Sequence, residues 1–286
     1  MYKFIPIRKT LVWGTESWVL SGIPGSESVV SEGPDAGRRL ADVWPGEFPL
    51  LIKFIETRSD LSIQVHPGDA LAAARHGGRG KTEMWYVIGA EPGTKLYCGL
   101  KEKISPAEYD RLVAEDRIAG VLAGHTVSPG DVFFVPAGRI HAIGGGCFLA
   151  EIQQSSDLTY RIYDYKRAGL DGKPRPLHTE LARDAIDYET VRPDYRMHYE
   201  RRRDEAVRLV QCLCFTTDLY DLSQPLEIPV PEPFLVLTGL SGTAAVRTAA
   251  GESSLQSGEA MLVPAADGTL ALLPGSGGVR LLATRP

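Results

Sequence analysis

The sequence predicts a mainly β protein of antiparallel barrel or jelly-roll architecture, and two observations support this. Strand-like segments recur along the whole chain and are broken by glycine and proline, of which there are 30 and 20 in 286 residues. Helical patterns, in contrast, are few and short. Many short strands separated by turn residues are typical of barrels and jelly rolls.

The expected strands are rich in apolar, β-branched and aromatic residues. They cover residues 11–14, 17–23, 50–56, 61–66, 83–90, 94–100, 126–137, 147–154, 159–165, 208–222, 233–246, 258–265 and 278–284. Three short helices are expected at 70–77, 105–116 and 177–188. The clearest is 105–116, because Ser105 can cap it, Pro106 fits its first turn and Glu108 can complete a capping box.

Charge and composition exclude several classes of partner. The net charge is −5, with acids and bases dispersed along the chain, so neither nucleic acid nor a membrane surface is expected as a partner. The N-terminal stretch carries charge too early for a signal peptide, and no apolar run approaches membrane-spanning length. We therefore expect a cytoplasmic protein.

Cys212 and Cys214 are expected as buried thiols on one face of a strand, since no CxxC pair is present.

Two stretches of the chain share one pattern. SPGDVFFVPAGRIHAIG at 128–144 and QSGEAMLVPAADGTLAL at 256–272 both contain x-G-D/E-x-x-x-V-P-A, which reads as a turn, a strand and an exit marked by proline. The pattern resembles the second motif of the cupin family, PGDxxxxPxxxxH. This resemblance implies two tandem cupin-like (jelly-roll) barrels. Only the first copy ends in a histidine, His141.

The repeat suggests a division of the chain by function. We expect a metal-binding catalytic cupin domain over residues 1–165, with a small helical segment at about 105–116. A connecting segment with a helix follows over 166–204. The second cupin-like barrel, over 205–286, should have no metal site, because no histidine follows His198.

The stretch DLSIQVHPGD at 60–69 alternates apolar and polar residues, which places Ser62, Gln64 and His66 on one face of a strand. Glu83 lies on a strand shortly downstream, and His141 ends the first repeat copy. Two imidazoles, a carboxylate and an amide oxygen suit a borderline divalent ion, most naturally Zn²⁺, with a position left open for substrate or water. We expect one Zn²⁺ per chain, held by Gln64, His66, Glu83 and His141.

A more specific resemblance follows from the order and spacing of four motifs. QVHP, GKTEMWY, VPAGRIHAIG and EIQQSSDLTYRIYDY together resemble type I mannose-6-phosphate isomerase in its short bacterial form. The match runs from about Trp13 to Tyr165 and is weaker beyond. The long helical insertion of the eukaryotic enzymes is missing. The resemblance implies the same four metal ligands and a pocket formed by Ser62, Lys81, Glu151, Asp157 and Arg161, with Trp13 in its wall.

The implied reaction moves a proton between C1 and C2 of a hexose 6-phosphate through an enediol. Arg161 is the first candidate for catalysis, because a fixed charge there can stabilise the enediolate or grip the phosphate. Lys81 and Ser62 are further candidates for phosphate contacts. Glu151 and Asp157 could position hydroxyls, orient Arg161 or move protons, and the sequence does not divide these roles.

Two other functions remain open on the sequence. A metal-dependent cupin oxygenase would use similar ligands with Fe²⁺, but it gives no reason for Lys81 and Arg161 beside the metal. A phosphosugar-binding cupin without turnover is a second alternative, and the presence of both cations argues against it. The sequence leaves the oligomeric state and the identity of the base open.

Overall fold

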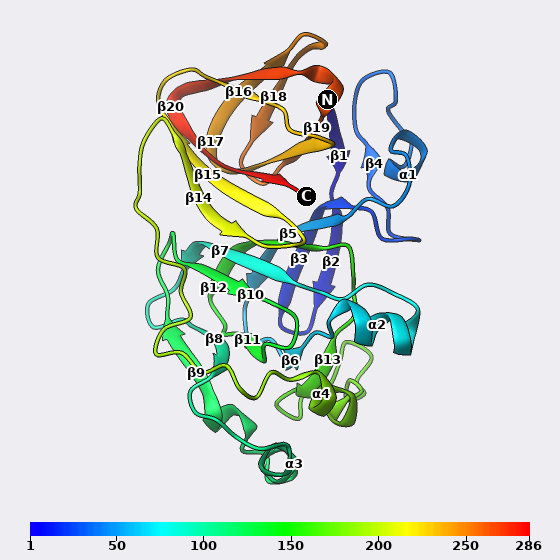
Figure 1. Cartoon of the computed structure of the whole chain (residues 1–286), viewed down its shortest axis with the longest axis vertical. Coiled ribbons are helices and arrows are strands. Elements are labelled where there is room, and N and C mark those ends of the chain that lie inside the picture. The colour runs from blue at the N-terminus through cyan, green and yellow to red at the C-terminus, as the bar shows by residue number, and fades with distance from the viewer. The chain divides into compact units, whose positions relative to one another are not determined.

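Antiparallel β-strands form most of the regular secondary structure, as the sequence predicts, and the computed structural model describes the whole chain, Met1–Pro286 (Figure 1). The chain forms two compact units. One consists of Met1–Ile7, Trp18–Lys53 and His198–Pro286, and the other of Arg8–Ser17 and Phe54–Met197. The functional boundaries expected at 165 and 205 stay a prediction. None of the helices has the length and apolar character that crossing a membrane requires.

Two antiparallel sheets contribute strands to the unit that contains Gln64, and three strands of the first sheet, Ile7–Leu11, Gly14–Ser21 and Leu50–Thr57, also include residues of the other unit. The strands of the first lie in the order β10 (Val132–Val135), β7 (Glu83–Ala90), β12 (Cys147–Gln154), β5 (Leu50–Thr57), β3 (Gly14–Ser21) and β2 (Ile7–Leu11). The strands of the second lie in the order β13 (Tyr160–Tyr163), β6 (Ile63–Val65), β11 (His141–Ile143), β8 (Lys95–Leu100) and β9 (Leu122–Thr126). Trp85 and Phe133 of the first sheet pack in one buried cluster with Leu96 and Ile143 of the second, so the sheets face each other across a shared core.

The other unit contains one sheet with its own apolar core. Its strands are β14 (Ala206–Gln211), β15 (Thr216–Leu222), β20 (Thr269–Arg285), β17 (Phe234–Thr248), β19 (Ala260–Pro264), β1 (Tyr2–Ile5) and β4 (Val29–Val30), with β16 (Leu226–Pro229) on β20 and β18 (Gly251–Gln256) on β17. The first strand of the chain pairs with one of the last: Tyr2 lies opposite Leu262 (Figure 1, β1 in blue). This pairing ties the N-terminus to the C-terminal strands.

Helices are short and few, as expected. They are α1 (Leu40–Val43), α2 (Asp69–His76), α3 (Pro106–Ala114) and α4 (Thr179–Ala185), with two 3₁₀ turns, η1 (Ile118–Val121) and η2 (Ala265–Asp267). The predicted cap of α3 is confirmed, because the Ser105 hydroxyl accepts the Glu108 backbone N–H at 3.1 Å and Pro106 occupies the first turn. The helix α1 was not predicted.

The repeated pattern builds the same turn twice. Gly130 and Gly258 both have positive φ, of 94° and 83°, which favours glycine at this position. The Asp131 carboxylate accepts the Ser128 N–H at 3.0 Å, and the Glu259 carboxylate accepts the Gln256 N–H at 2.9 Å. The acidic residue after each glycine therefore closes the turn before the strand begins.

The expectation for residues 208–222 is wrong in one respect. Instead of one strand, the segment forms the hairpin of β14 and β15, and Cys212 and Cys214 lie in its turn. Both thiols are partly exposed rather than buried, and Leu213 between them is fully exposed. The two strands have six and seven residues, and the turn between them contains neither glycine nor proline. The sequence therefore offered no signal for this turn.

Candidate functional site

Three neighbouring strands bring predicted site residues into one row. In the sheet register, Arg161 of β13 lies opposite Gln64 of β6, and Gln64 in turn lies opposite His141 of β11. Side chains directly opposite each other project from the same face of a sheet. The alternation in β6 thus places Gln64 beside residues that are 77 and 97 positions away in the sequence.

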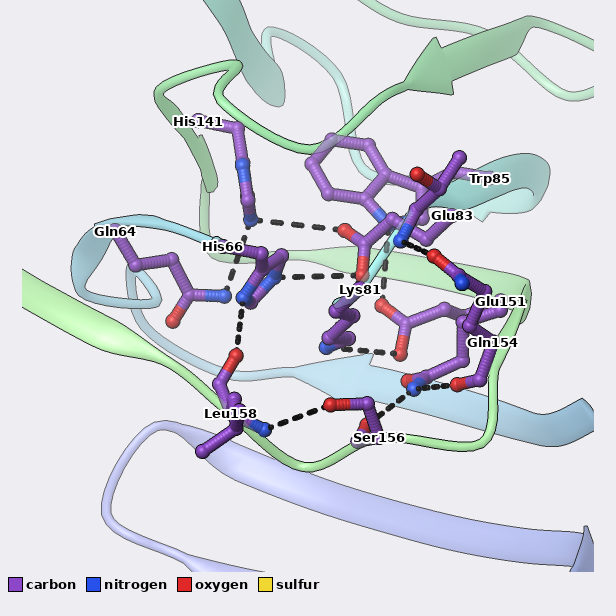
Figure 2. Close-up of polar contacts among 12 residues, drawn as sticks. Gln64, His66, Lys81, Glu83, Trp85, His141, Glu151, Gln154, Ser156 and Leu158 are labelled. Carbon is purple, nitrogen blue, oxygen red and sulfur yellow. Dashed lines mark hydrogen bonds and ion pairs between the residues drawn. The ribbon is translucent and has the colours of Figure 1, made fainter. Parts of the chain in front are cut away.

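His66, Glu83 and His141 form a buried cluster that no other residues of the chain reproduce. Their donor atoms all lie within 4.8 Å of one another. Nε2 of His66 lies 3.4 Å from Oε2 of Glu83, and Nε2 of His141 lies 3.6 Å from Oε1 (Figure 2). All three side chains are excluded from solvent. The sequence correctly predicted that these three residues, from β7, β11 and the end of β6, would meet.

The outer nitrogen of each imidazole contacts a backbone carbonyl. Nδ1 of His66 lies 2.9 Å from the Leu158 carbonyl, and Nδ1 of His141 lies 2.8 Å from the Arg139 carbonyl. A carbonyl oxygen only accepts hydrogen bonds, so each Nδ1 must carry the proton. In the neutral imidazole, the lone pair of each Nε2 therefore faces Glu83.

In this arrangement the Nε2 atoms of the two imidazoles, which are hydrogen-bond acceptors, point at the Glu83 carboxylate oxygens, which are also acceptors. Nε2 of His66 and Oε1 of Glu83 are buried and have no hydrogen-bond partner. Unpaired buried acceptors are costly, and two facing lone pairs repel unless a cation lies between them. The donor set therefore fits a divalent ion, since neutral imidazole nitrogen and carboxylate oxygen are ligands that Zn²⁺ accepts.

Electrostatics favour the protonation states that such a site needs. Burial, together with the nearby Lys81 charge, lowers the pKa of His66 to about 3, and burial also lowers the pKa of His141. Burial raises the pKa of Glu83, but the charge of Lys81 and the contact with His66 outweigh it, so that the pKa lies well below its usual value. Neutral imidazoles beside an ionised carboxylate are the binding forms of all three ligands.

Lys81 and Glu151 extend the cluster along β7 and β12. Nζ of Lys81 lies 3.0 Å from Glu83 Oε2 and 3.9 Å from Glu151 Oε1. The indole N–H of Trp85 donates to Glu151 Oε2 at 3.1 Å (Figure 2). The buried ammonium group thus lies between two carboxylates, one of which belongs to the candidate metal cluster.

Gln64 touches the cluster through its amide nitrogen. Its Nε2 donates to Nε2 of His141 at 3.2 Å, while its Oε1 faces the Ser62 hydroxyl at 3.4 Å. Ligation through the oxygen, as predicted, requires a half turn about the last bond of the side chain. The predicted shared face of Ser62 and Gln64 is present.

Three other predicted site residues, Arg161, Asp157 and Trp13, differ in how deeply their side chains are buried. The Arg161 guanidinium donates to the Pro176 carbonyl at 2.9 Å, and burial, followed by the charge of Arg175, lowers its pKa. Asp157 is exposed and makes no hydrogen bond or ion pair. Trp13 is buried in the cluster that contains Trp85, so it forms part of the core. The structure therefore does not bring Asp157 or Trp13 into contact with the His66, Glu83 and His141 cluster.

Two kinds of residue at this site were not predicted from the sequence. Trp85 could have been found, because it lies two positions after Glu83 on the same strand and must share its face. The Leu158 and Arg139 carbonyls could not, because a backbone acceptor leaves no mark in the sequence.

Comparisons with known proteins point to one family. No protein-family model matches the chain. Mannose-6-phosphate isomerase ManA of Bacillus subtilis (strain 168) is 30% identical over 298 residues, which cover 91% of this chain and 92% of that protein. A mannose-6-phosphate isomerase of Streptococcus mutans serotype c is 32% identical over 260 residues, which cover 87% of this chain and 82% of the relative. The crystal structure of the mannose 6-phosphate isomerase from Bacillus subtilis superposes with a TM-score of 0.91 at 27% identity, covering 100% of this chain and 99% of that one. The similarity therefore extends over nearly the whole length of both chains.

Proposed function

The chain belongs to the mannose-6-phosphate isomerase family, and from this premise we propose that it interconverts mannose 6-phosphate and fructose 6-phosphate. The observation that carries the proposal is the buried cluster of His66, Glu83 and His141, in which His66 Nε2 and Glu83 Oε1 have no hydrogen-bond partner. A carbonyl and a hydroxyl on adjacent carbons of an open-chain sugar present two oxygens to such a site. The cluster and its cationic neighbours supply what an aldose-ketose isomerase needs.

We propose that the ion is Zn²⁺, one per chain, held by the imidazoles of His66 and His141, the Glu83 carboxylate and the Gln64 amide oxygen. When bound, it would act as a Lewis acid or as a template for the sugar oxygens. The chain offers one cluster of this kind, in support of a single ion per chain.

The cations would act on the substrate's negative charges. Arg161, opposite Gln64 in the sheet, would stabilise the enediolate with its fixed charge. Lys81 and Ser62 would contact the phosphate or the oxygens near it, and both are buried beside the candidate ligands. Binding energy from the phosphate would position C1 and C2 for proton transfer.

The acidic residues have different support for their roles. Glu151 accepts a hydrogen bond from the Trp85 indole and lies near Lys81. It is therefore better placed than Asp157 to position a substrate hydroxyl or to move a proton. Asp157 would need to reach the substrate from an exposed position. Trp13 would contribute to the pocket wall through the packing of its cluster.

We further propose that the chain contains two tandem cupin-like barrels and that only the first carries a metal. The repeated turns at Gly130 and Gly258 support the internal repeat. The proposed catalytic domain covers residues 1–165, the connecting segment 166–204 and the second barrel 205–286. We propose the cytoplasm as the compartment, consistent with free cysteines throughout.

The test is a coupled isomerase assay on the purified protein under Zn²⁺ saturation. We expect turnover of mannose 6-phosphate and fructose 6-phosphate, with a much lower kcat/KM for unphosphorylated mannose and for glucose 6-phosphate. Comparable kcat/KM for free mannose, or a preference for glucose 6-phosphate, would refute the substrate assignment. Binding of mannose 6-phosphate without turnover would favour a phosphosugar-binding cupin, and oxygen consumption with bound Fe²⁺ would favour an oxygenase.

A further inference from the structure

The segment that follows β12 makes the only hydrogen bond seen at the outer nitrogen of His66. The Leu158 carbonyl accepts the proton of Nδ1 at 2.9 Å. This contact decides which nitrogen of His66 is protonated and in which direction the ring presents its lone pair. A peptide carbonyl can do this reliably only if the peptide itself is fixed.

Two buried side chains hold the backbone that leads into this peptide. The Ser156 hydroxyl donates to the Arg79 carbonyl at 2.8 Å, and the Leu158 N–H approaches the same hydroxyl at 3.4 Å. The Gln153 amide nitrogen donates to the carbonyls of Gln154 and Ser156, at 2.8 and 2.7 Å. Ser156 is 6% exposed and Gln153 is fully buried. Figure 2 shows Leu158 below His66, and Ser156 beside Leu158.

These contacts form a continuous path from the core to the candidate metal cluster. Gln153 lies opposite Glu83 in the pairing of β12 with β7, so one end of the path starts beside a candidate ligand. The other end reaches His66 through the Leu158 carbonyl. Neither Gln153 nor Ser156 contacts the Nε2 atom that would bind the ion.

We infer that Ser156 and Gln153 are positioning residues for the metal: they hold the Leu158 carbonyl in place, and the carbonyl keeps the His66 lone pair directed at the ion. The inference rests on the proposed metal site. A group that hydrogen-bonds a metal-binding histidine, as the Leu158 carbonyl does here, fixes the tautomer and orientation of the ring, and loss of such a contact typically weakens metal binding about 10- to 100-fold. The effect on the ion should therefore exceed the effect on the fold.

The experiment measures the Zn²⁺ dissociation constant of the full chain by competition with a chromophoric chelator. For Ser156→Ala we expect binding about 10- to 100-fold weaker than wild type. Ser156→Thr keeps the hydroxyl and should restore most of the affinity. A matched control is Ser28→Ala, which removes an equally buried hydroxyl that accepts the Ser21 N–H at 2.8 Å in the other unit. Its Zn²⁺ affinity should equal that of wild type.

A second variant and a spectroscopic measurement keep the test decisive. Gln153→Met keeps a similar side-chain volume but removes both N–H donors of the amide, so it should also weaken Zn²⁺ binding. This variant tests the inference if Ser156→Ala does not fold. In the metal-free protein, the nitrogen-bound proton of His66 Nδ1 should be protected from exchange in wild type and should lose that protection in Ser156→Ala.

The outcomes separate this inference from the proposed function. If wild type binds Zn²⁺ and isomerises the sugar, but Ser156→Ala and Gln153→Met bind Zn²⁺ within twofold of wild type, the positioning role is wrong and the isomerase assignment stands. If wild type binds no Zn²⁺, the metal site is wrong and this inference falls with it.

Discussion

Nζ of Lys81 lies 3.0 Å from Oε2 of Glu83, and the two side chains are 4% and 0% exposed. A buried ammonium group this close to a carboxylate keeps it ionised, which the lowered pKa of Glu83 reflects after burial has opposed it. Lys81 therefore keeps Glu83 in the ionised form that binds a metal and also places a buried positive charge beside the candidate metal cluster. The two roles predict different kinetic effects when the charge is removed.

Lys81→Met keeps the aliphatic length and removes the charge. We expect KM for mannose 6-phosphate to rise at least as much as kcat falls, because a charge that binds substrate in both the ground and transition states acts mainly on KM. Lys103→Met is the matched control, since Lys103 is exposed and pairs only with Glu189 on the surface. Steady-state kinetics at saturating Zn²⁺ decide the point: a fall in kcat with unchanged KM would assign Lys81 to the transition state instead.

Arg161→Ala should act mainly on kcat. A charge that stabilises the developing enediolate contributes in the transition state, and loss of such a group costs about 10²- to 10³-fold in rate. Arg161→Lys should recover little, because an ammonium group does not reproduce the planar guanidinium. Arg183→Ala, which removes an exposed arginine paired with Asp110, is the control. An Arg161→Ala enzyme with near-normal kcat and a raised KM would exchange the roles of Arg161 and Lys81.

Gly80→Ala should disturb the segment that carries Lys81. A Cβ at this position would lie 2.5 Å from the Asp69 nitrogen and 2.6 Å from the Gly68 carbonyl carbon, both backbone atoms. The segment must therefore shift, and overpacking of this kind costs about 1–3 kcal/mol. We expect a lower Tm and a raised KM, measured by calorimetry and kinetics. Gly120→Ala has open space around its Cβ and should change neither; a neutral Gly80→Ala would show that this segment is not held in place.

Asp164 should make stability depend on pH. Burial raises its pKa, but hydrogen bonds from Arg175 and Arg167 outweigh burial and hold the pKa below its usual value. A carboxylate whose pKa is lower in the folded state stabilises the fold above its unfolded pKa of about 3.9, and the contribution is lost as pH falls through the folded value.

We therefore expect metal-free Asp164→Asn to be less stable than wild type at pH 7, with the difference shrinking as the pH is lowered below about 4. Urea unfolding at several pH values measures this. Asp157→Asn, at an exposed position without polar contacts, should follow wild type at every pH. A constant difference between Asp164→Asn and wild type would mean that the Asp164 charge does not contribute.

Local patterns predicted much of the fold and of the candidate site. The bounds of β7 and β12 were predicted correctly, because each strand is rich in apolar residues and lies between polar or turn residues. His66, Glu83 and His141 were correctly brought together by strand alternation and motif order. Their roles as ligands stay predictions.

What the sequence could not predict depends on long-range pairing and on backbone atoms. The pairing of β1 with β19 joins residues some 260 positions apart, and no local pattern records it. The orientation of the Gln64 amide depends on its neighbours, Ser62 and His141, rather than on its own sequence context. The burial of Trp13 likewise follows from packing against residues that lie far away along the chain.

The most direct test of the proposed function is the isomerase activity of the metal-stripped wild-type protein as Zn²⁺ is added back. Because His66, Glu83 and His141 form a single cluster, we expect activity to be absent without metal and to rise to a plateau at one Zn²⁺ per chain. His141→Ala should stay inactive throughout, whereas His198→Ala, at an exposed histidine, should follow wild type. Full interconversion of mannose 6-phosphate and fructose 6-phosphate by the metal-free protein, or by His141→Ala, would contradict the proposed metal-dependent isomerase.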